Sequence, residues 1–334
     1  MPEESAVTAA AVLVLLDHAP DGALRPAVPE LVTLARDVAG PAGVAGVWVA
    51  GPDDEATVPT DALGVLGLDV VHRVRVDAEP HVAAVLADAV AAARESTGAA
   101  LVLLASTFEN RDVAARLAVT LGAGVVTDAD AVQIEDGTVV AAKTVLAGTW
   151  TTRCAVRTPL AVVCVKAGAV AAQEAARPTA PEVVEHALAV GAGARRVQVV
   201  ERTEHGDSGR PDLASAQVVV VGGRGTEGDF APLTELADLL GAAVGATRVA
   251  TDEGWIDRDT QIGQTGVNVA PRLYIGAGVS GAVHHRGGMQ AAGVIVAVNN
   301  DPDAPIFEIA DYGVVGDLFA VLPQLTAELR RLRA

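Results

Sequence analysis

The sequence has few of the residues that mark several classes of protein. It contains two cysteines in 334 residues and no Cys-x-x-Cys pair, which excludes a disulfide framework and a thiol redox site. Cys154 and Cys164 are therefore expected to be free thiols, and any redox chemistry needs a cofactor. Lys and Arg number 24 against 42 Asp and Glu. Because nucleic acids and anionic membrane surfaces are bound through clustered basic residues, we expect the chain to bind no nucleic acid.

Long hydrophobic runs are also missing. No stretch approaches the ~20 apolar residues that a spanning helix requires, which predicts no direct membrane insertion. The first apolar run, at residues 7–16, follows two glutamates, whereas a secretory signal begins with basic residues. The sequence therefore predicts a cytoplasmic protein.

Aromatic residues make up 3% of the chain, whereas hydrophobic residues make up 51%. The core must consist of Val, Leu, Ile and Ala, as in parallel sheets flanked by helices. Between residues 12 and 121, short β-branched runs alternate with helical patterns, which is typical of a doubly wound sheet. Shorter strand-like pieces follow up to residue 156, so we expect this domain to finish with an antiparallel addition.

A polar segment, RTEHGDSGRPD at residues 202–212, interrupts the apolar pattern. A second series of strand and helix patterns begins after it and ends with a helix at residues 318–331. The sequence predicts an α/β fold of two doubly wound domains, the second with a Rossmann-like parallel sheet. The first domain is expected at residues 1–201, the linker at 202–212 and the second domain at 213–334.

A glycine-rich turn, Gly222-Gly223-Arg224-Gly225, follows the strand predicted at residues 218–221. Glycines permit close backbone approach and arginine pairs with phosphate, so the turn suits a dinucleotide. It matches neither the G-x-G-x-x-G nor the G-x-x-x-x-G-K-[ST] pattern, and a purely structural turn explains it equally well.

A second cluster places hydroxyl, amide and guanidinium groups on irregular backbone between strands. Such groups suit a polar planar ligand. A solvated loop is the alternative, and residue types do not decide between them. The members of the cluster are Thr247, Arg248, Gln261, Ile262, Gly263, Gln264, Thr265 and Gly266.

The third cluster is a small-residue turn, GVSGAVHH at residues 278–285. Ser280 is expected to cap a helix that runs past Met289, and the N–H groups at its start would suit a pyrophosphate. An ordinary capped helix is the alternative. Because adjacent helical residues such as His284 and His285 point about 100° apart, we predict no metal site.

The fourth cluster lies at residues 297–318, a segment dense in Asn and Asp. Asn299 and Asp317 would lie at strand and helix ends, where open α/β sheets place their ligands, although turn chemistry explains them equally well. A hydrolase built of Ser280, His285 and Asp311 is not favoured, because no G-x-S-x-G elbow follows a strand.

Taken together, the four clusters resemble the FAD-binding domain of electron-transfer flavoprotein alpha subunits, the FixB family. The segments LYIGAGVSGAVHH, VIVAVNNDPDAPIFEIADYG and VVGDLF carry the resemblance, and GGRG, ATR and QIGQTG precede them in the family's order. The resemblance implies one FAD in this chain and a heterodimer with a beta subunit, which would hold AMP or a second FAD. The first domain is then a scaffold that contacts the beta subunit.

The implied activity is electron transfer without substrate turnover, so no catalytic residue is expected. Electrons would come from acyl-CoA or other flavin dehydrogenases. They would pass through a flavin semiquinone to a membrane quinone oxidoreductase or another acceptor. The alpha subunit of an electron-bifurcating flavoprotein and an NAD-dependent enzyme on the same fold remain open as alternatives.

The resemblance also assigns places around FAD. Near the ring it implies Gln264 and Thr265 as donors, Thr265 toward N5, with Arg248 beside the ring and His285 by its O2 edge. Arg248, Thr265 and His285 would then tune the redox couple. The phosphates would be held by Arg224, Thr247, Ser280, Gly281, Ala282 and Val283, and the adenosine half by Asn299, Asp317 and Leu318. Gln261, Ile262, Gly263 and His284 complete the implied site.

Overall fold

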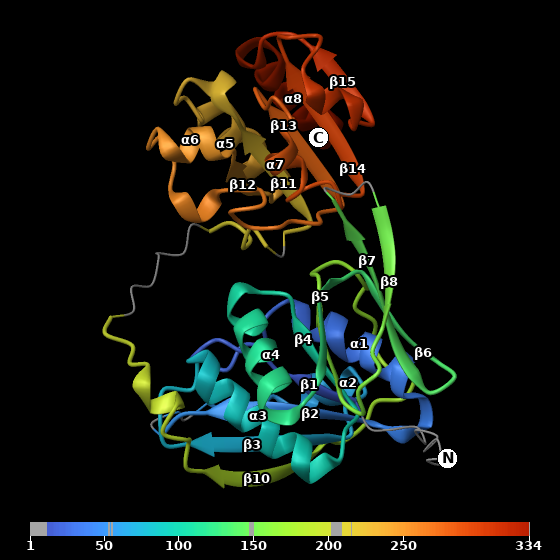
Figure 1. The fold of residues 1–334 in the computed structure, drawn as a ribbon. Coiled ribbons are helices and arrows are strands. Elements are labelled where there is room, and N and C mark those ends of the chain that lie inside the picture. The colour runs from blue at the N-terminus through green and yellow to red at the C-terminus, as the bar shows by residue number, and fades with distance from the viewer. Residues whose placement is uncertain are drawn as a thin grey trace. The chain divides into compact units, whose positions relative to one another are not determined.

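The computed structural model describes residues 12–52, 54, 56–146, 150–201, 209–214 and 216–333 (Figure 1). These residues form two compact units. The first unit contains the described residues up to 143 and from 151 to 201, and the second contains residues 144–146, 150 and those from 209 onward. Residues 202–208 of the predicted linker lie outside the described residues, so the linker stays a prediction.

The first unit is built on a sheet of seven parallel strands, in the order β10-β3-β2-β1-β4-β9-β5. Its central strands are buried along their whole length, which explains their nearly continuous apolar sequence. The strands are β1 (Val12–Leu15), β2 (Val44–Ala50), β3 (Val70–Val76), β4 (Leu101–Ala105), β5 (Gly124–Ala129), β9 (Ala161–Val165) and β10 (Glu182–Leu188).

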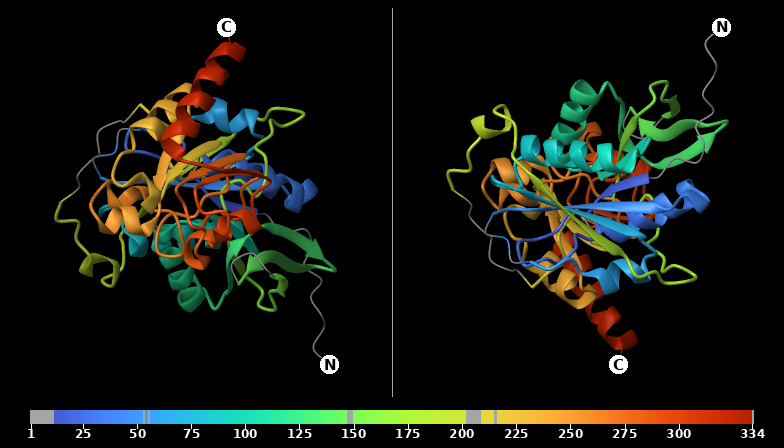
Figure 2. Two further views of the ribbon diagram at one scale, coloured as in Figure 1. Left: turned by 90° about the horizontal axis from the view of Figure 1, so that it is seen from above. Right: turned by 90° about the horizontal axis from the view of Figure 1, so that it is seen from below.

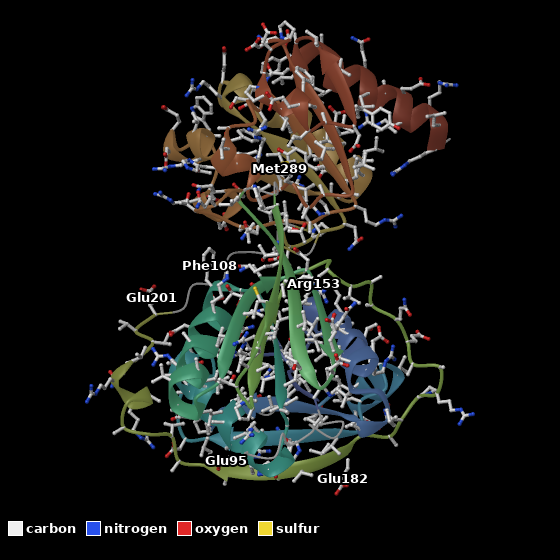
Figure 3. The ribbon with its side chains drawn as sticks, turned by 45° about the vertical axis from the view of Figure 1, so that its right-hand side comes forward. Glu95, Phe108, Arg153, Glu182, Glu201 and Met289 are labelled. Carbon is white, nitrogen blue, oxygen red and sulfur yellow. The ribbon has the colours of Figure 1, made fainter. Side chains whose placement is uncertain are left out.

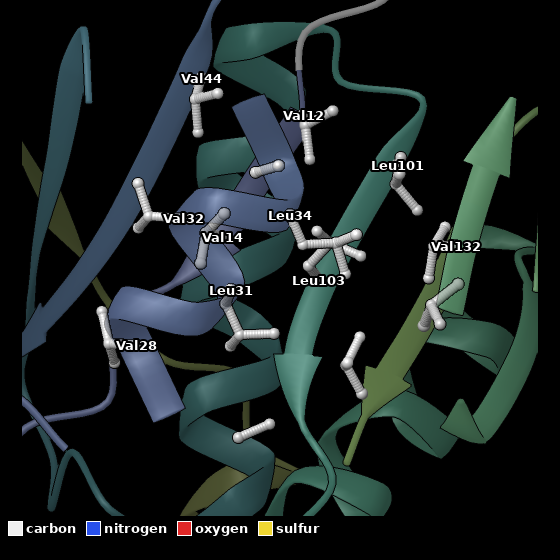
Figure 4. Close-up of a cluster of buried hydrophobic side chains, with 14 of the residues drawn as sticks. Val12, Val14, Val28, Leu31, Val32, Leu34, Val44, Leu101, Leu103 and Val132 are labelled. Carbon is white, nitrogen blue, oxygen red and sulfur yellow. The ribbon is translucent and has the colours of Figure 1, made fainter. Parts of the chain in front are cut away.

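Helices cover both faces of this sheet. Successive strand residues point to opposite faces, so Val14 packs in a layer with α1 (Ala27–Ala39), whereas Leu13 packs with α3 (Ala83–Thr97) and α4 (Phe108–Leu121). Figure 2 shows α3 and α4 together on one side of the strands, and Figure 4 shows the apolar side chains of the α1 layer. A short helix, α2 (Thr60–Val65), precedes β3. This arrangement confirms the predicted doubly wound α/β fold.

The expected antiparallel addition forms, but the expectation that the first domain finishes with it is wrong. An antiparallel pair, β6 (Ala131–Glu135) and β7 (Thr138–Val145), does form, and β8 (Trp150–Ala155) joins it. The chain then returns to the seven-stranded sheet, where β9 lies between β4 and β5. The reason is the apolar run of β9, AVVCV, which is buried throughout and suits a central strand. Cys154 and Cys164 are free, as predicted.

The second unit contains five parallel strands in the order β12-β11-β13-β14-β15. They are β11 (Val218–Gly222), β12 (Ala243–Ala246), β13 (Leu273–Ala277), β14 (Val294–Asn299) and β15 (Tyr312–Val315). On one face, α5 (Ala231–Leu240) and α8 (Leu318–Arg333) pack through Leu233, Leu236 and Leu322. The other face is covered by irregular segments and includes Met289, which is fully buried (Figure 3). The Rossmann-like parallel sheet is confirmed.

Among the described residues, no helix is both long and apolar enough to cross a bilayer.

A histidine pair joins the edge strand β10 to β3. Nδ1 of His72 lies 2.8 Å from Nε2 of His186, and His72 is only 7% exposed. Burial, and then the neighbouring His186, lower the pKa of His72 from its ordinary 6.5. The unfolded chain therefore takes up this proton more readily than the folded chain, and folding stability is lost as the pH falls below about 6.5.

We expect acid to loosen the pairing of β10 with β3. Amide hydrogen exchange of residues 182–188, corrected for the intrinsic effect of pH, should accelerate between about pH 7 and about pH 5.5. The His72→Gln variant keeps a hydrogen-bonding amide that does not titrate, so its exchange should change less. The same pH dependence in both proteins would contradict this account.

Candidate functional site

The candidate site lies at the carboxyl edge of the five-stranded sheet. The first strand along the chain, β11, has β12 on one side and β13 on the other, so the chain reverses its winding direction between β11 and β13. Open α/β sheets bind their ligands in the crevice at such a switch point. Apart from Gln261 to Thr265, which come after α6 (Arg248–Asp252), every residue of the predicted site ends a strand, as Asn299 does, or lies in the turn or helix that follows the carboxyl end of a strand.

Two glycine turns touch at the switch point. The N–H of Gly223 donates to the carbonyl of Ala277 at 3.1 Å, and the N–H of Gly225 donates to the carbonyl of Gly278 at 3.1 Å. A Cβ on Gly223 would lie 2.3 Å from the Gly278 oxygen, and a Cβ on Gly225 would lie 2.8 Å from its Cα. No side chain fits there, so the glycines are needed for this close contact.

Two arginines are exposed at this edge. Arg224 begins a 3-10 turn, Arg224–Thr226, and pairs with no carboxylate among the described residues. Arg248 begins α6 and contacts Asp252, with Nε and Oδ2 3.1 Å apart. The guanidinium of Arg224 is therefore open to an anionic ligand, whereas that of Arg248 already has a partner on its own helix.

A buried glutamine supports the loop at residues 261–265. Gln261 is 3% exposed; its Oε1 accepts from the hydroxyl of Thr251 and its Nε2 donates to the hydroxyl of Thr265, both at 3.0 Å. Gln264 and Thr265 are exposed, whereas Ile262 is buried. Thr265 is thus the member of this network that faces solvent, and Gln261 holds it in place.

His285 is buried behind the same loop. It is 6% exposed, its Nδ1 lies 3.1 Å from the carbonyl oxygen of Ile262, and its Nε2 lies 2.7 Å from the hydroxyl of Tyr274. Burial lowers the pKa of His285 to about 4. His285 is therefore uncharged at neutral pH, while its neighbour His284 is exposed.

The turn before His285 differs from its prediction. The cap of α7 (Val283–Arg286) is Ala282 rather than Ser280, without a side-chain hydrogen bond. The helix ends at Arg286, because the next residues are two glycines and a Cβ on Gly288 would lie 2.5 Å from the backbone of Gly263. The expected capped helix past Met289 is wrong, and one helical turn takes its place.

This turn nevertheless presents backbone donors. Gly281 has φ +77°, and its Cβ would lie 2.4 Å from the amide nitrogen of Ile306. Within the described part of the chain, the N–H groups of Gly281 and Ala282 form no backbone hydrogen bond. The first N–H groups of a helix also have no intrahelical acceptor. Open N–H groups near the exposed Arg224 edge fit a ligand with phosphate groups.

The two Asx residues of the fourth cluster hold loops in place. Nδ2 of Asn299 donates to the carbonyl of Val279 at 2.8 Å, and its Oδ1 accepts from the N–H of Asp301 at 3.0 Å. Oδ1 of Asp317 accepts from the N–H of Phe319 at 2.9 Å, at the start of α8. Asp317 is exposed and Leu318 is buried. Their contacts with a cofactor stay a prediction.

Two residues that support the site, Thr251 and Tyr274, are not predicted from the sequence. Tyr274 is one of the two tyrosines and lies in an apolar strand, where a buried hydroxyl needs a hydrogen-bond partner. The need for a partner could have indicated that Tyr274 takes part in a buried hydrogen bond. Its partner, His285, follows only from the packing of α7 against β13.

The carboxyl edge of the first sheet has polar groups that satisfy one another. Nδ2 of Asn110 donates to Asp17 at 2.7 Å, and burial raises the pKa of Asp17 to about 6. Arg111 pairs with Asp128 at 2.8 Å. These side chains at the edge of the first sheet are therefore less available to a ligand than the exposed Arg224 at the edge of the second sheet.

Comparisons with known proteins agree with the two units. A family model described as the electron transfer flavoprotein domain matches residues 12–190, and one described as the electron transfer flavoprotein FAD-binding domain matches residues 212–290. The electron transfer flavoprotein subunit alpha of Mycobacterium leprae is 41% identical over 326 residues, 95% of this chain and 97% of the relative. That of Bacillus subtilis is 34% identical over 334 residues, 96% and 98% of the two chains. That of Paracoccus denitrificans is 57% identical over 128 residues, 38% of this chain and 42% of the relative.

We expect Gly223→Ala to destabilise the second unit by about 1–3 kcal/mol, because the added Cβ overpacks the contact between the two turns. Gly193→Ala is the matched control, since nothing lies within 4 Å of a Cβ at that position. Urea unfolding of both variants and the parent protein measures the difference. Equal stability of the two variants would show that the turns do not require this close approach.

Proposed function

Because the chain belongs to the family of electron transfer flavoprotein alpha subunits, we propose that it carries electrons on an FAD held at the carboxyl edge of its five-stranded sheet. Its C-terminal domain is an FAD-binding domain. The proposed position of FAD rests on the pair of glycine turns at the switch point, which lie beside the exposed Arg224 and open backbone N–H groups. An electron carrier of this kind turns over no substrate of its own.

The proposed partners follow from the family. The relatives are named as alpha subunits, which supports a heterodimer with a beta subunit that holds AMP or a second FAD. Acyl-CoA or other flavin dehydrogenases would donate the electrons, and a membrane quinone oxidoreductase would accept them. We propose the first unit as the scaffold that contacts the beta subunit, with the domain bounds at 1–201 and 213–334.

The residues around the site fit FAD. Arg224 and the N–H groups of Gly281 and Ala282 would hold the phosphates, together with the hydroxyls of Thr247 and Ser280. Asn299, Asp317 and Leu318 would border the adenosine half. The exposed residues Gln264, Thr265 and His284 would line the flavin ring. Ile262 and Gly263 are buried and would support the loop that carries Gln264 and Thr265. Bound FAD supplies electron transfer in one- or two-electron steps.

Arg248 is proposed to stabilise the negative charge that reduction brings into the site. Two unit charges ~4 Å apart interact by about 1 kcal/mol in water and about 4 kcal/mol at an effective dielectric of 20. For a one-electron couple this corresponds to roughly 40–170 mV. The side chain of Arg248 is 63% exposed, so solvent screening favours the lower value.

The first test is the cofactor content of the protein coexpressed with its beta subunit. We expect flavin absorption bands and one FAD per alpha chain, without turnover of NADH by the purified protein. Produced alone, the chain should lose flavin. A colourless protein that oxidises NADH would instead support the NAD-dependent enzyme.

The second test is Arg248→Ala. We expect this variant to keep most of its FAD and to lower the reduction potential by on the order of 40 mV, because a cation is lost beside the reduced cofactor. Arg330→Ala is the control, since Arg330 pairs with Glu235 near the far end of α8. Spectroelectrochemical titration measures the potential. An unchanged potential in Arg248→Ala would refute the tuning role.

A further inference from the structure

Thr251 connects α6 to the loop at residues 261–266. It lies on α6 and is 9% exposed. Its hydroxyl oxygen lies 3.0 Å from the carbonyl oxygen of Arg248 and 3.0 Å from Oε1 of Gln261. Both of these oxygens accept, so they share the single proton of the hydroxyl. Among the described residues, the bond to Gln261 is the one hydrogen bond that joins α6 to this loop.

The backbone of Gln261 is fixed independently of this contact. Its N–H donates to the carbonyl of Arg258 at 3.2 Å, and its carbonyl accepts from the N–H of Val267 at 2.7 Å. The side-chain amide instead contacts two threonines, Thr251 through Oε1 and Thr265 through Nε2. Because a side-chain amide accepts through Oε1 and donates through Nε2, its orientation determines the direction of both hydrogen bonds.

This orientation decides which role Thr265 can take. Nε2 of Gln261 donates to the hydroxyl oxygen of Thr265 at 3.0 Å, which leaves the proton of that hydroxyl for another acceptor. Thr265 is exposed, whereas Gln261 is 3% exposed. In the reversed orientation, Oε1 would accept the proton of Thr265, and Thr265 would have none to donate outward. The orientation in the structure therefore makes Thr265 an outward donor.

We propose that Thr251 is a positioning residue of the cofactor site: its hydroxyl orients the amide of Gln261 and thereby keeps the hydroxyl of Thr265 available as a donor to the flavin ring. Thr251 is buried and acts through Gln261. The inference rests on the proposed function, in which FAD lies beside this loop. A donor beside the ring stabilises the negative charge that reduction adds, so it raises the reduction potential.

The hydroxyl of Thr251 supplies the donor that the buried end of the amide needs. Without it, Oε1 of Gln261 would be a buried acceptor without a donor, which is unfavourable. The amide can then turn, so that Oε1 accepts the proton of Thr265 instead. Thr251→Val removes the hydroxyl and keeps the branched shape of the side chain, so it tests this contact rather than the packing of α6.

The first measurement is the reduction potential of the FAD-loaded protein, coexpressed with its beta subunit. We expect Thr251→Val to lower the potential, and Thr251→Ser, which restores a hydroxyl, to return it to the parent value. Thr265→Val should lower the potential at least as much. Adding Thr251→Val to Thr265→Val should lower it no further, because Thr251 acts through Thr265.

Thr326→Val is the matched control. Thr326 is 1% exposed on α8 of the same unit, and its hydroxyl has no hydrogen-bond partner among the described residues. Loss of this hydroxyl should leave the potential unchanged. The proposal is overturned if Thr251→Val keeps the parent potential, if Thr251→Ser shifts it as much as Thr251→Val does, or if the shifts of Thr251→Val and Thr265→Val add.

A second measurement needs no variant to fold. In the parent protein with ¹⁵N-labelled glutamine side chains, the Nε2 protons of Gln261 should show nuclear Overhauser contacts to the methyl group of Thr265 rather than to that of Thr251. The reverse pattern would overturn the proposal. Absence of flavin from the parent protein would refute the proposed function instead, which keeps the two failures distinct.

Discussion

The contact between the turns after β11 and β13 is the constraint on which the second unit depends. Both strands end at the switch point of the sheet, and their following residues approach so closely that Gly223 and Gly278 leave no room for a Cβ. Backbone atoms rather than side chains therefore form the contact between the two turns at this edge of the sheet. Open N–H groups and the Arg224 guanidinium are among the polar features of this edge, and they suit a phosphate-containing cofactor.

A second layer of buried hydrogen bonds supports the groups at this edge. Gln261 holds Thr265, Asn299 holds the backbone of Val279, and Tyr274 holds His285. Each supporting group is buried, whereas the supported loops carry exposed residues. Redox sites depend on such support, because a donor that shifts its position or its proton changes the charge balance around the cofactor.

Much of the fold could be predicted from the sequence, because buried parallel strands have continuous apolar runs. β4, with the sequence LVLLA, is such a run, whereas β12, with the sequence AVGA, and β15, which is exposed throughout, are not, so the sequence indicates them less clearly. The motifs of the site were identified from their residue types and from their order along the chain. The length of α7 was not, since it depends on the contact of Gly288 with Gly263. The pairing of Tyr274 with His285 could not be predicted either, because it arises from tertiary packing.

Hydrogen–deuterium exchange of the protein with and without FAD tests the central claim most directly, since the two sheets offer two candidate edges. FAD is expected to slow exchange at residues 281–284, where open backbone N–H groups would meet the phosphates, and at Arg224 beside them. Slower exchange confined to residues 16–18 and 106–111, at the carboxyl edge of the first sheet, would contradict it.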